Sequence, residues 1–184
     1  VAVAAGTRLG SAAFLFYLFA YTLATFGAFA VVTTIGNSGE RNQDLVDYEG
    51  LWSVRPGLAI AMGVCMLALM GFPLFGGIGF FAKWYLLQAA LGSPHNLIPL
   101  SIILVLTSVI AAGYYLNVLR VMFMKPRPEG ASDIGPIGPL SQGVLAVTVA
   151  LITGLGLFPS HLAMWTRGST PMAPNQTAAQ ATNK

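Results

Sequence analysis

The sequence predicts an all-α membrane protein, a polytopic bundle of about four transmembrane helices with one long helix broken near Gly71–Gly77. The composition is the first observation behind this prediction: 55% of the residues are hydrophobic and 8% are charged, and the mean hydropathy is +0.72. A soluble domain carries about 25% charged residues. The second observation is that most charges lie between long apolar segments rather than within them. Such a chain has too little polar surface to cover itself in water.

The first span is predicted at residues 11–35, because no charged residue lies between Leu9 and Gly39. A helix that crosses a bilayer needs about 20 apolar residues, so this segment suffices for one crossing. Bulky aromatic and small residues alternate along it, and small residues let helices approach closely within lipid. We interpret both kinds as packing residues: Phe14, Tyr17, Tyr21, Phe26 and Phe29 are bulky, and Gly27, Ala28 and Ala30 are small.

A polar segment follows at residues 36–55 and contains four carboxylates and two arginines. The carboxylate spacing does not match an EF-hand loop, so we expect a solvated loop and no metal site. Residues 47–52 within it are predicted to form a short interfacial helix capped by Asp47, with Trp52 at the level of the lipid headgroups. The only cysteine, Cys65, lies in an apolar segment, which leaves neither a disulfide framework nor a cysteine metal site.

The second apolar segment, residues 56–91, is too long for one straight crossing. As a continuous helix it would measure about 54 Å, against a hydrocarbon core of about 30 Å. Pro73 removes a backbone donor, and Gly71, Gly76 and Gly77 add backbone freedom, so the helix is expected to break there. Within a membrane, the open backbone of a broken helix must be buried in protein or border a water-filled cavity. Broken helices recur at the ion sites of transporters.

Lys83 lies beyond this break and is the only charged residue between Pro56 and Arg120. A buried ammonium is costly, so it must find water, a carboxylate or dipolar groups, or give up its proton. The alternative is that its side chain snorkels to the headgroups near Gly92, roughly 13 Å of helix rise away. The depth of Lys83 and the adjacent break favour proton transfer over snorkelling.

The third and fourth spans are predicted at residues 99–124 and 140–158. Tyr114, Tyr115 and Asn117 give the third span a polar side, which could line a polar path. The transmembrane bundle is expected to occupy residues 1–166. The remaining residues, 167–184, are small and polar, and we expect them to be disordered.

The distribution of lysine and arginine predicts that the loops at residues 36–55 and 121–138 are cytoplasmic. These loops and the adjoining span end carry Arg41, Arg55, Arg120, Lys125 and Arg127, whereas the opposite side has Arg8, Arg167 and Lys184. The basic residues are scattered among the spans, so nucleic acid is not an expected partner. The first residues, VAVAAGTRLG, contain neither an initiator Met nor a basic leader, and we expect the chain to be the C-terminal part of a longer protein.

Five motifs occur in order along the chain: FAYTLATFGAFAVV, DYEGLWSVRPGLAIAM, GFPLFGGIGFFAKWYLL, SVIAAGYYLNVLRVMF and GLFPSHL. Together they resemble the C-terminal third of the subunit N family of bacterial NADH–quinone oxidoreductase (complex I), which are antiporter-like, proton-pumping membrane subunits. The resemblance covers nearly the whole chain apart from the tail. It implies the last helices of a fourteen-helix subunit, with a discontinuous helix at residues 56–91 and Lys83 in the second half-channel. The glutamate and lysines that the family uses on earlier helices are absent here.

The resemblance also implies a multi-pass protein of the bacterial inner membrane that forms part of a translocase, coupling quinone reduction to proton transfer. Its expected partners are the other membrane subunits of the complex, the lipid bilayer and the missing N-terminal helices of the same subunit. No residue cluster here suits flavin, an iron–sulfur centre or a nicotinamide nucleotide. The chain itself is therefore expected to bind no cofactor and to hold no redox catalytic residue, while the whole complex uses NADH and quinone.

Two alternatives remain open. A subunit of a multi-subunit sodium/proton antiporter or of a membrane-bound hydrogenase would share both the glycine/proline break and the lysine, although the GYYLNVLRVMF segment favours subunit N. A purely structural membrane subunit, in which Lys83 only anchors or pairs, is the other alternative. Membrane-embedded glutamate and lysine residues upstream would distinguish a proton-transfer subunit from a structural one.

Overall fold

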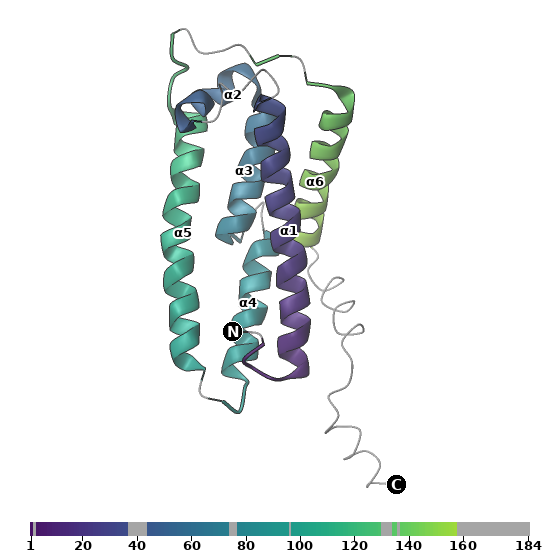
Figure 1. The fold of residues 1–184 in the computed structure, drawn as a ribbon, viewed down its shortest axis with the longest axis vertical. Coiled ribbons are helices and arrows are strands. Elements are labelled where there is room, and N and C mark those ends of the chain that lie inside the picture. Colours follow the sequence, from purple (N-terminus) through teal and green to yellow (C-terminus); the bar gives the residue numbers. More distant parts are fainter. Residues whose placement is uncertain are drawn as a thin grey trace.

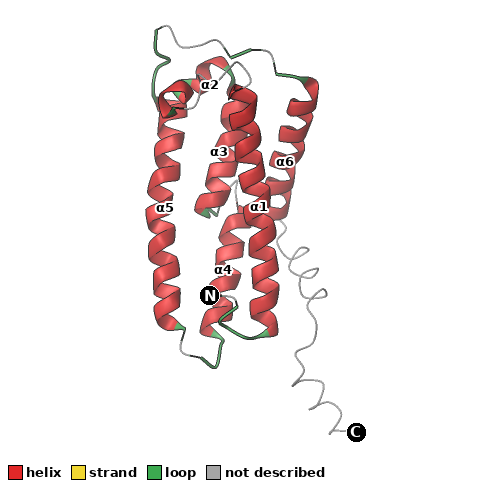
Figure 2. Ribbon diagram, in the orientation of Figure 1, coloured by secondary structure: helices red, strands yellow, loops and turns green. Residues whose placement is uncertain are grey.

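The computed structural model describes residues 1, 3–36, 44–73, 77–95, 97–129, 134–135 and 137–157. Within these ranges the regular structure is helical, which confirms the predicted all-α bundle (Figure 2). The elements are α1 (Arg8–Gly36), the 3-10 helix η1 (Leu45–Tyr48), α2 (Leu51–Val54), α3 (Pro56–Met70), α4 (Gly77–Leu91), α5 (Ile98–Met124) and α6 (Pro139–Leu157).

Three helices, α1, α5 and α6, are long and apolar enough to cross a membrane individually. The helices α3 and α4 have 15 residues each, about 22 Å, and are too short alone. They follow one another along the bundle, so together they are long enough for a fourth crossing (Figure 1). The predicted break in a long helix is therefore confirmed. The boundary at residues 166 and 167 between bundle and tail lies outside the described residues.

Helix α1 is the central element, because it packs against α3, α4 and α6. Its buried side is built mainly of alanines, which allow close approach of neighbouring helices. At Gly27 a Cβ atom would lie 2.6 Å from the Cys65 sulfur of α3 and 2.8 Å from the Thr148 methyl carbon of α6. The packing role predicted for the small residues is consistent with these contacts.

Several of the bulky residues of α1 behave differently from the prediction. Phe26 and Phe29 are 58% and 63% exposed, and Phe14 and Tyr21 are 41% and 48% exposed. A helix can turn only part of its circumference toward its partners in this chain, and the alanines occupy that part. Phe26 and Phe29 consequently face lipid or further protein instead of packing within these helices.

The two loops at one end of the bundle are joined to each other. Arg127 Nη1 donates to the carbonyl oxygens of Asp47 (2.9 Å) and Glu49 (3.3 Å), and the Lys125 ammonium forms an ion pair with the Glu49 carboxylate. Arg55 Nη2 donates to the carbonyl oxygen of Ile134 at 2.7 Å. Residues 44–55, 125–129 and 134–135 therefore form one layer at the end of the bundle that carries α2 (Figure 1).

The interfacial helix expected at residues 47–52 is in fact two short helices, η1 and α2. Gly50 separates them with a left-handed backbone, φ 64°. The N-cap of η1 is Asp44 rather than Asp47, while Asp47 Oδ2 accepts a hydrogen bond from the Asp44 amide at 3.0 Å. A Cβ atom at Gly50 would lie 2.6 Å from the backbone nitrogen of Arg127, so the crossing loop leaves no room for a side chain there.

Candidate functional site

Backbone hydrogen bonds satisfy some, but not all, of the carbonyl groups at the C-terminus of α3. Gly71 takes a left-handed conformation, φ 82°, and its amide donates to the Ala68 carbonyl oxygen at 3.1 Å. The amide of Phe72 donates to the Leu67 carbonyl oxygen at 3.0 Å. These two bonds make a Schellman-type terminus. The last four carbonyls of a helix lack partners within it, so those of Leu69 and Met70 still need donors.

The Lys83 side chain supplies both missing donors. Its Nζ lies 2.8 Å from the Met70 carbonyl oxygen and 3.2 Å from that of Leu69. Side chains on a helix lean toward its N-terminus, which directs Lys83 from α4 back to the break and away from the Gly92 end. The ammonium also lies at the negative end of the α3 dipole. The half-buried Lys83 thereby joins the two halves of the broken helix.

Two glycines make this approach possible. A Cβ atom at Gly71 would lie 3.1 Å from Lys83 Cδ and 3.3 Å from its Nζ. A Cβ atom at Gly79 would lie 1.7 Å from the Ala68 carbonyl oxygen, so any side chain there would separate α4 from the end of α3. Gly79 was not among the residues predicted from the sequence, although the repeated spacing Gly77-x-Gly79 after a proline was a usable signal.

Helix α6 supports the first turn of α4 through a third close contact. A Cβ atom at Gly156 would lie 2.8 Å from the backbone nitrogen of Ile78 and 3.1 Å from that of Gly77. The predicted break residue Gly77 is thus buried at a helix crossing. Pro73 is an exposed bend residue after α3, and Gly76 lies outside the described residues.

The three polar residues predicted as a possible lining lie on α5 but point in different directions. Tyr114 is 72% exposed, and Asn117 is also exposed. Tyr115 is half-buried and packs against the core. None of the three borders the two cavities described next, so their role as a lining stays a prediction.

Lys83 borders a cavity on each of two sides. The larger, called here the α4–α5 cleft, has a volume of about 400 Å³ and mostly apolar walls, including Phe80, Trp84 and Val109. The smaller, called here the α1 cavity, has about 20 Å³ and lies between α1, α3 and α4. Tyr17 and Tyr21 border the α1 cavity together with Lys83. Lys83 therefore lies between these two cavities.

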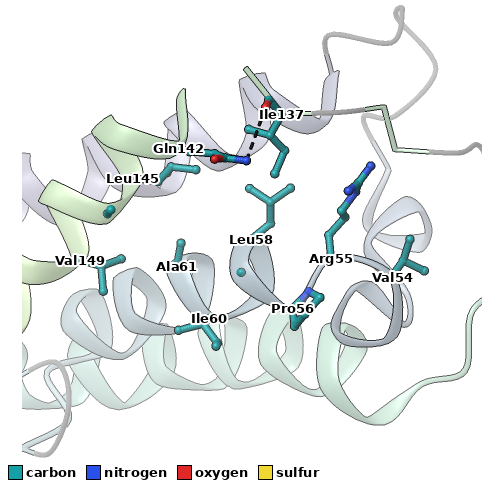
Figure 3. Close-up of a pocket in the computed structure, with 12 residues that line it drawn as sticks. Val54, Arg55, Pro56, Leu58, Ile60, Ala61, Ile137, Gln142, Leu145 and Val149 are labelled. Atoms are coloured by element: carbon teal, nitrogen blue, oxygen red, sulfur yellow. Dashed lines mark hydrogen bonds between the residues drawn. The ribbon is translucent and has the colours of Figure 1, made fainter. Parts of the chain in front are cut away.

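A further cavity of about 480 Å³ lies between α3 and α6, toward the end that carries the loops (Figure 3). Leu58 of α3 and Leu145 of α6 line it, and the Gln142 amide reaches the Ile137 carbonyl oxygen at 3.5 Å. Arg55 borders the cavity, but its Nε and Nη2 are directed to the carbonyl groups of residues 134 and 135. Lys83 is not part of this cavity.

Comparison with known proteins identifies the family. Residues 1–124 match the family model described as "NADH:quinone oxidoreductase/Mrp antiporter, TM". The chain belongs to this family. The matched part includes α1, both halves of the broken helix and α5, so the Lys83 site lies within the family's transmembrane region. The membrane location predicted for a multi-pass protein is confirmed by this membership.

Within this family, the chain is similar to proteins named NADH-quinone oxidoreductase subunit N. The chain is 46% identical over 170 residues to NADH-quinone oxidoreductase subunit N of Gemmatimonas aurantiaca, covering 92% of this chain and 32% of the relative. It is 36% identical to subunit N of Halorhodospira halophila, covering 88% of this chain and 34% of the relative. The chain thus spans about a third of the length of these relatives. The predicted resemblance to bacterial subunit N, and with it the inner-membrane location, is confirmed.

A solved structure agrees with the sequence relatives. The fold matches a chain in respiratory complex I from Thermus thermophilus with bound aureothin, with a TM-score of 0.64 and 29% identity, covering 88% of this chain and 36% of that one. The family model alone includes both oxidoreductase and antiporter subunits. The subunit N names of the relatives favour the oxidoreductase branch over the antiporter alternative.

Proposed function

We propose that this chain forms the last membrane helices of an antiporter-like subunit N, within an NADH–quinone oxidoreductase that translocates protons as quinone is reduced. The names of its relatives and the complex I fold support this assignment. The proposed partners are the other membrane subunits, the N-terminal helices of the same subunit and lipid. NADH and quinone would act elsewhere in the complex, and this chain would contribute proton transfer without a redox centre.

The geometry of Lys83 carries the proposal for its role. An ammonium has three N–H donors, and two of them are directed to the carbonyls of Leu69 and Met70. The third N–H has no acceptor among the residues that the structure describes, and the side chain borders two cavities. After losing that proton, the neutral amine would keep two N–H groups and both carbonyl bonds. Lys83 can therefore change charge without moving its nitrogen.

Opposing influences act on the charge of Lys83. The carbonyl end of α3 stabilises the ammonium, whereas the apolar walls of the α4–α5 cleft favour the neutral amine. When two such influences are close in size, a charge that appears or disappears on a neighbouring helix can decide the protonation state. Coupling between charged groups along the membrane would act on Lys83 in this way.

Substitution of Lys83 in the full-length subunit, assembled in the complex, tests the proposal. Lys83→Ala removes the proton carrier, and we expect coupled quinone reduction and proton pumping to fall at least tenfold. Lys83→Arg keeps a cation that can bond the carbonyls, but its guanidinium stays charged and does not release its proton, so it should not restore pumping. Lys125→Ala removes a lysine outside the spans and is the matched control, with pumping expected near the unmodified rate.

A structural role is the competing candidate, and the two carbonyl bonds specifically favour it. If Lys83 only caps α3, Lys83→Arg should pump normally, and Lys83→Ala should cost about 1–3 kcal/mol of stability through the carbonyls left without partners. Pumping and quinone reductase activity, both normalised to assembled complex, separate the two. Normal coupled activity in Lys83→Ala would end the proton-carrier proposal.

A further inference from the structure

Three hydroxyl side chains of α1 share one helix face, and two of them, Tyr17 and Tyr21, border the α1 cavity together with Lys83. Tyr17, Tyr21 and Thr25 are spaced four residues apart, so they lie one turn above another. The rings of Tyr17 and Tyr21 are stacked, with centroids 6.0 Å apart. The tyrosine hydroxyls form no hydrogen bond within the part of the chain that the structure describes. A row of hydroxyls along an apolar transmembrane helix is costly unless water or polar groups meet it.

Thr25 continues the same helix face one turn beyond Tyr21, next to the residues that line the α1 cavity but not among them. Its Oγ1 is buried and lacks a hydrogen-bond partner among the described residues. Four other threonines in these helices bond back to a carbonyl one turn earlier, including Thr34 to Ala30 at 2.6 Å and Thr148 to Val144 at 2.8 Å. A buried hydroxyl left unsatisfied costs about 1–3 kcal/mol. Thr25 departs from the local pattern in the same row as the two tyrosines.

The α1 cavity, bordered by Lys83, Tyr17 and Tyr21, has the size and the polar groups that one water needs. Its volume is about 20 Å³, whereas a single water needs roughly 10–15 Å³ and two to four polar partners. The possible partners are the third N–H of Lys83, the tyrosine hydroxyls and the backbone carbonyl of Leu69, which also borders the cavity. No carboxylate borders it among the described residues, so the lysine charge is not neutralised there.

We propose that the α1 cavity binds one water that links the Lys83 ammonium to the Tyr21 hydroxyl, and that Tyr17, Tyr21 and Thr25 form the α1 wall of the proton path. This inference rests on the proposed role of Lys83 in proton transfer. The ammonium gives a proton to the water, the water gives one to the Tyr21 oxygen, and the tyrosine passes its own hydroxyl proton onward. Lys83 is left as a neutral amine until another proton reaches it, so one proton enters and one leaves.

The α4–α5 cleft is the other route away from Lys83, and its walls are less suited. Apart from Lys83, its polar side chains are Ser108, whose Oγ donates to the Leu104 carbonyl of its own helix at 2.8 Å, and Trp84, whose indole N–H can donate but not accept. The remaining lining, including Val109, is apolar. Proton transfer along hydrogen-bonded groups needs successive polar atoms. Those atoms lie along α1.

Isosteric substitutions in the full-length subunit, assembled in the complex, test this path. Tyr21→Phe and Thr25→Val each remove one hydroxyl, and with it a hydrogen-bond donor and acceptor, while nearly keeping the shape of the side chain. We expect each to lower the initial pumping rate about two- to tenfold, the equivalent of one hydrogen bond, and to increase the solvent deuterium isotope effect on pumping. Tyr85→Phe, whose ring packs on Phe16 at 5.2 Å outside the cavity, and Thr22→Val on the exposed face are the matched controls and should leave both quantities unchanged.

A high-resolution structure of the unmodified complex supplies the second readout, independent of whether the variants assemble. Density for a water within hydrogen-bond distance of Lys83 Nζ, between α1 and α4, is expected. If Lys83→Ala pumps normally, the proposed function fails and this inference fails with it. If Lys83→Ala is impaired while Tyr21→Phe and Thr25→Val pump normally, or if no water occupies the α1 cavity, the α1 path alone is overturned.

Discussion

At the scale of single residues, the Lys83 side chain both satisfies backbone carbonyl groups and places a titratable charge inside the bundle. The break in α3–α4 exposes the carbonyls of Leu69 and Met70, and the lysine that bonds them comes from the second turn of the following half-helix. A buried cation and two unpaired carbonyls would each be unfavourable alone in lipid. Placed together, they stabilise each other and keep the ammonium at a fixed position.

Gly79 is the residue whose replacement should disturb this arrangement most directly. In Gly79→Ala the new methyl group would begin 1.7 Å from the Ala68 carbonyl oxygen, so α4 would have to move away from α3. Forced overpacking of this kind costs about 1–3 kcal/mol, more than the roughly 1 kcal/mol that alanine gains over glycine in a helix. We expect a lower melting temperature of the assembled complex and reduced pumping.

Gly113→Ala is the matched control for that substitution. Gly113 lies within α5, and a Cβ atom there would meet nothing within 4 Å. The change should be neutral or stabilise the complex by up to about 1 kcal/mol. Equal melting temperatures for Gly79→Ala and Gly113→Ala would contradict the close α3–α4 contact.

At the scale of elements, α6 braces the start of α4 across a glycine contact. The prediction is that Gly156→Ala pushes α6 away, because its Cβ would begin 2.8 Å from the backbone nitrogen of Ile78, which cannot rotate aside. Gly154→Ala, two residues earlier on the same helix, has nothing within 4 Å and should be tolerated. Thermal stability of the assembled complex should fall for Gly156→Ala alone, by about 1–3 kcal/mol. A similar loss for both variants would point to α6 helix propensity rather than to the crossing.

The layer formed by the two loops gives a second prediction at this scale. Arg55 donates three hydrogen bonds to the carbonyls of Ile134 and Gly135, using a planar fork that lysine lacks. Arg55→Lys should therefore destabilise the docking of this segment by about 1–3 kcal/mol. Arg120→Lys makes the same substitution at an exposed position on α5, also without a change of charge, and should have little effect. Thermal unfolding of the two variants makes the comparison, and an unaffected Arg55→Lys would show that the fork is dispensable.

The sequence predicts those features that depend on neighbouring residues, and it does not predict those that depend on contacts between residues far apart in the chain. Pro73 and the glycines indicated the break, and the absence of other charges singled out Lys83, because both signals are local. The bonds from Lys83 to α3 depend on how the half-helices stack, which no local pattern encodes. Gly156 acts on Gly77, far away in the sequence. Tyr17 and Tyr21 looked like packing residues because only their position beside Lys83 gives their hydroxyls a possible role.

At the scale of the whole molecule, the outer faces of α1 and α5 are more apolar than a water-exposed surface allows. On α5, Ile102, Leu106, Val109 and Ile110 are each more than half exposed. These faces suit contact with lipid or with further apolar helices. Lys83 borders a cleft on the α5 side, so this side of the site is open to whatever covers that face.

The orientation of the bundle in the membrane gives the last prediction. The end that carries Arg55, Arg120, Lys125 and Arg127 also holds the joined loops, and an excess of lysine and arginine in short loops marks the cytoplasmic side. Single cysteines would be introduced one at a time into a full-length subunit freed of other cysteines, including Cys65. Val46→Cys and Met124→Cys, at positions 57% and 79% exposed, lie at this end, whereas Leu91→Cys, at a position 61% exposed, lies at the opposite end. A membrane-impermeant maleimide should label the first two only in inside-out vesicles and the third only in right-side-out vesicles.

If Val46→Cys and Met124→Cys were labelled from opposite sides, the shared loop layer would be contradicted. If both were labelled only from the periplasmic side, the bundle would be inverted and the charge asymmetry would have misled the assignment.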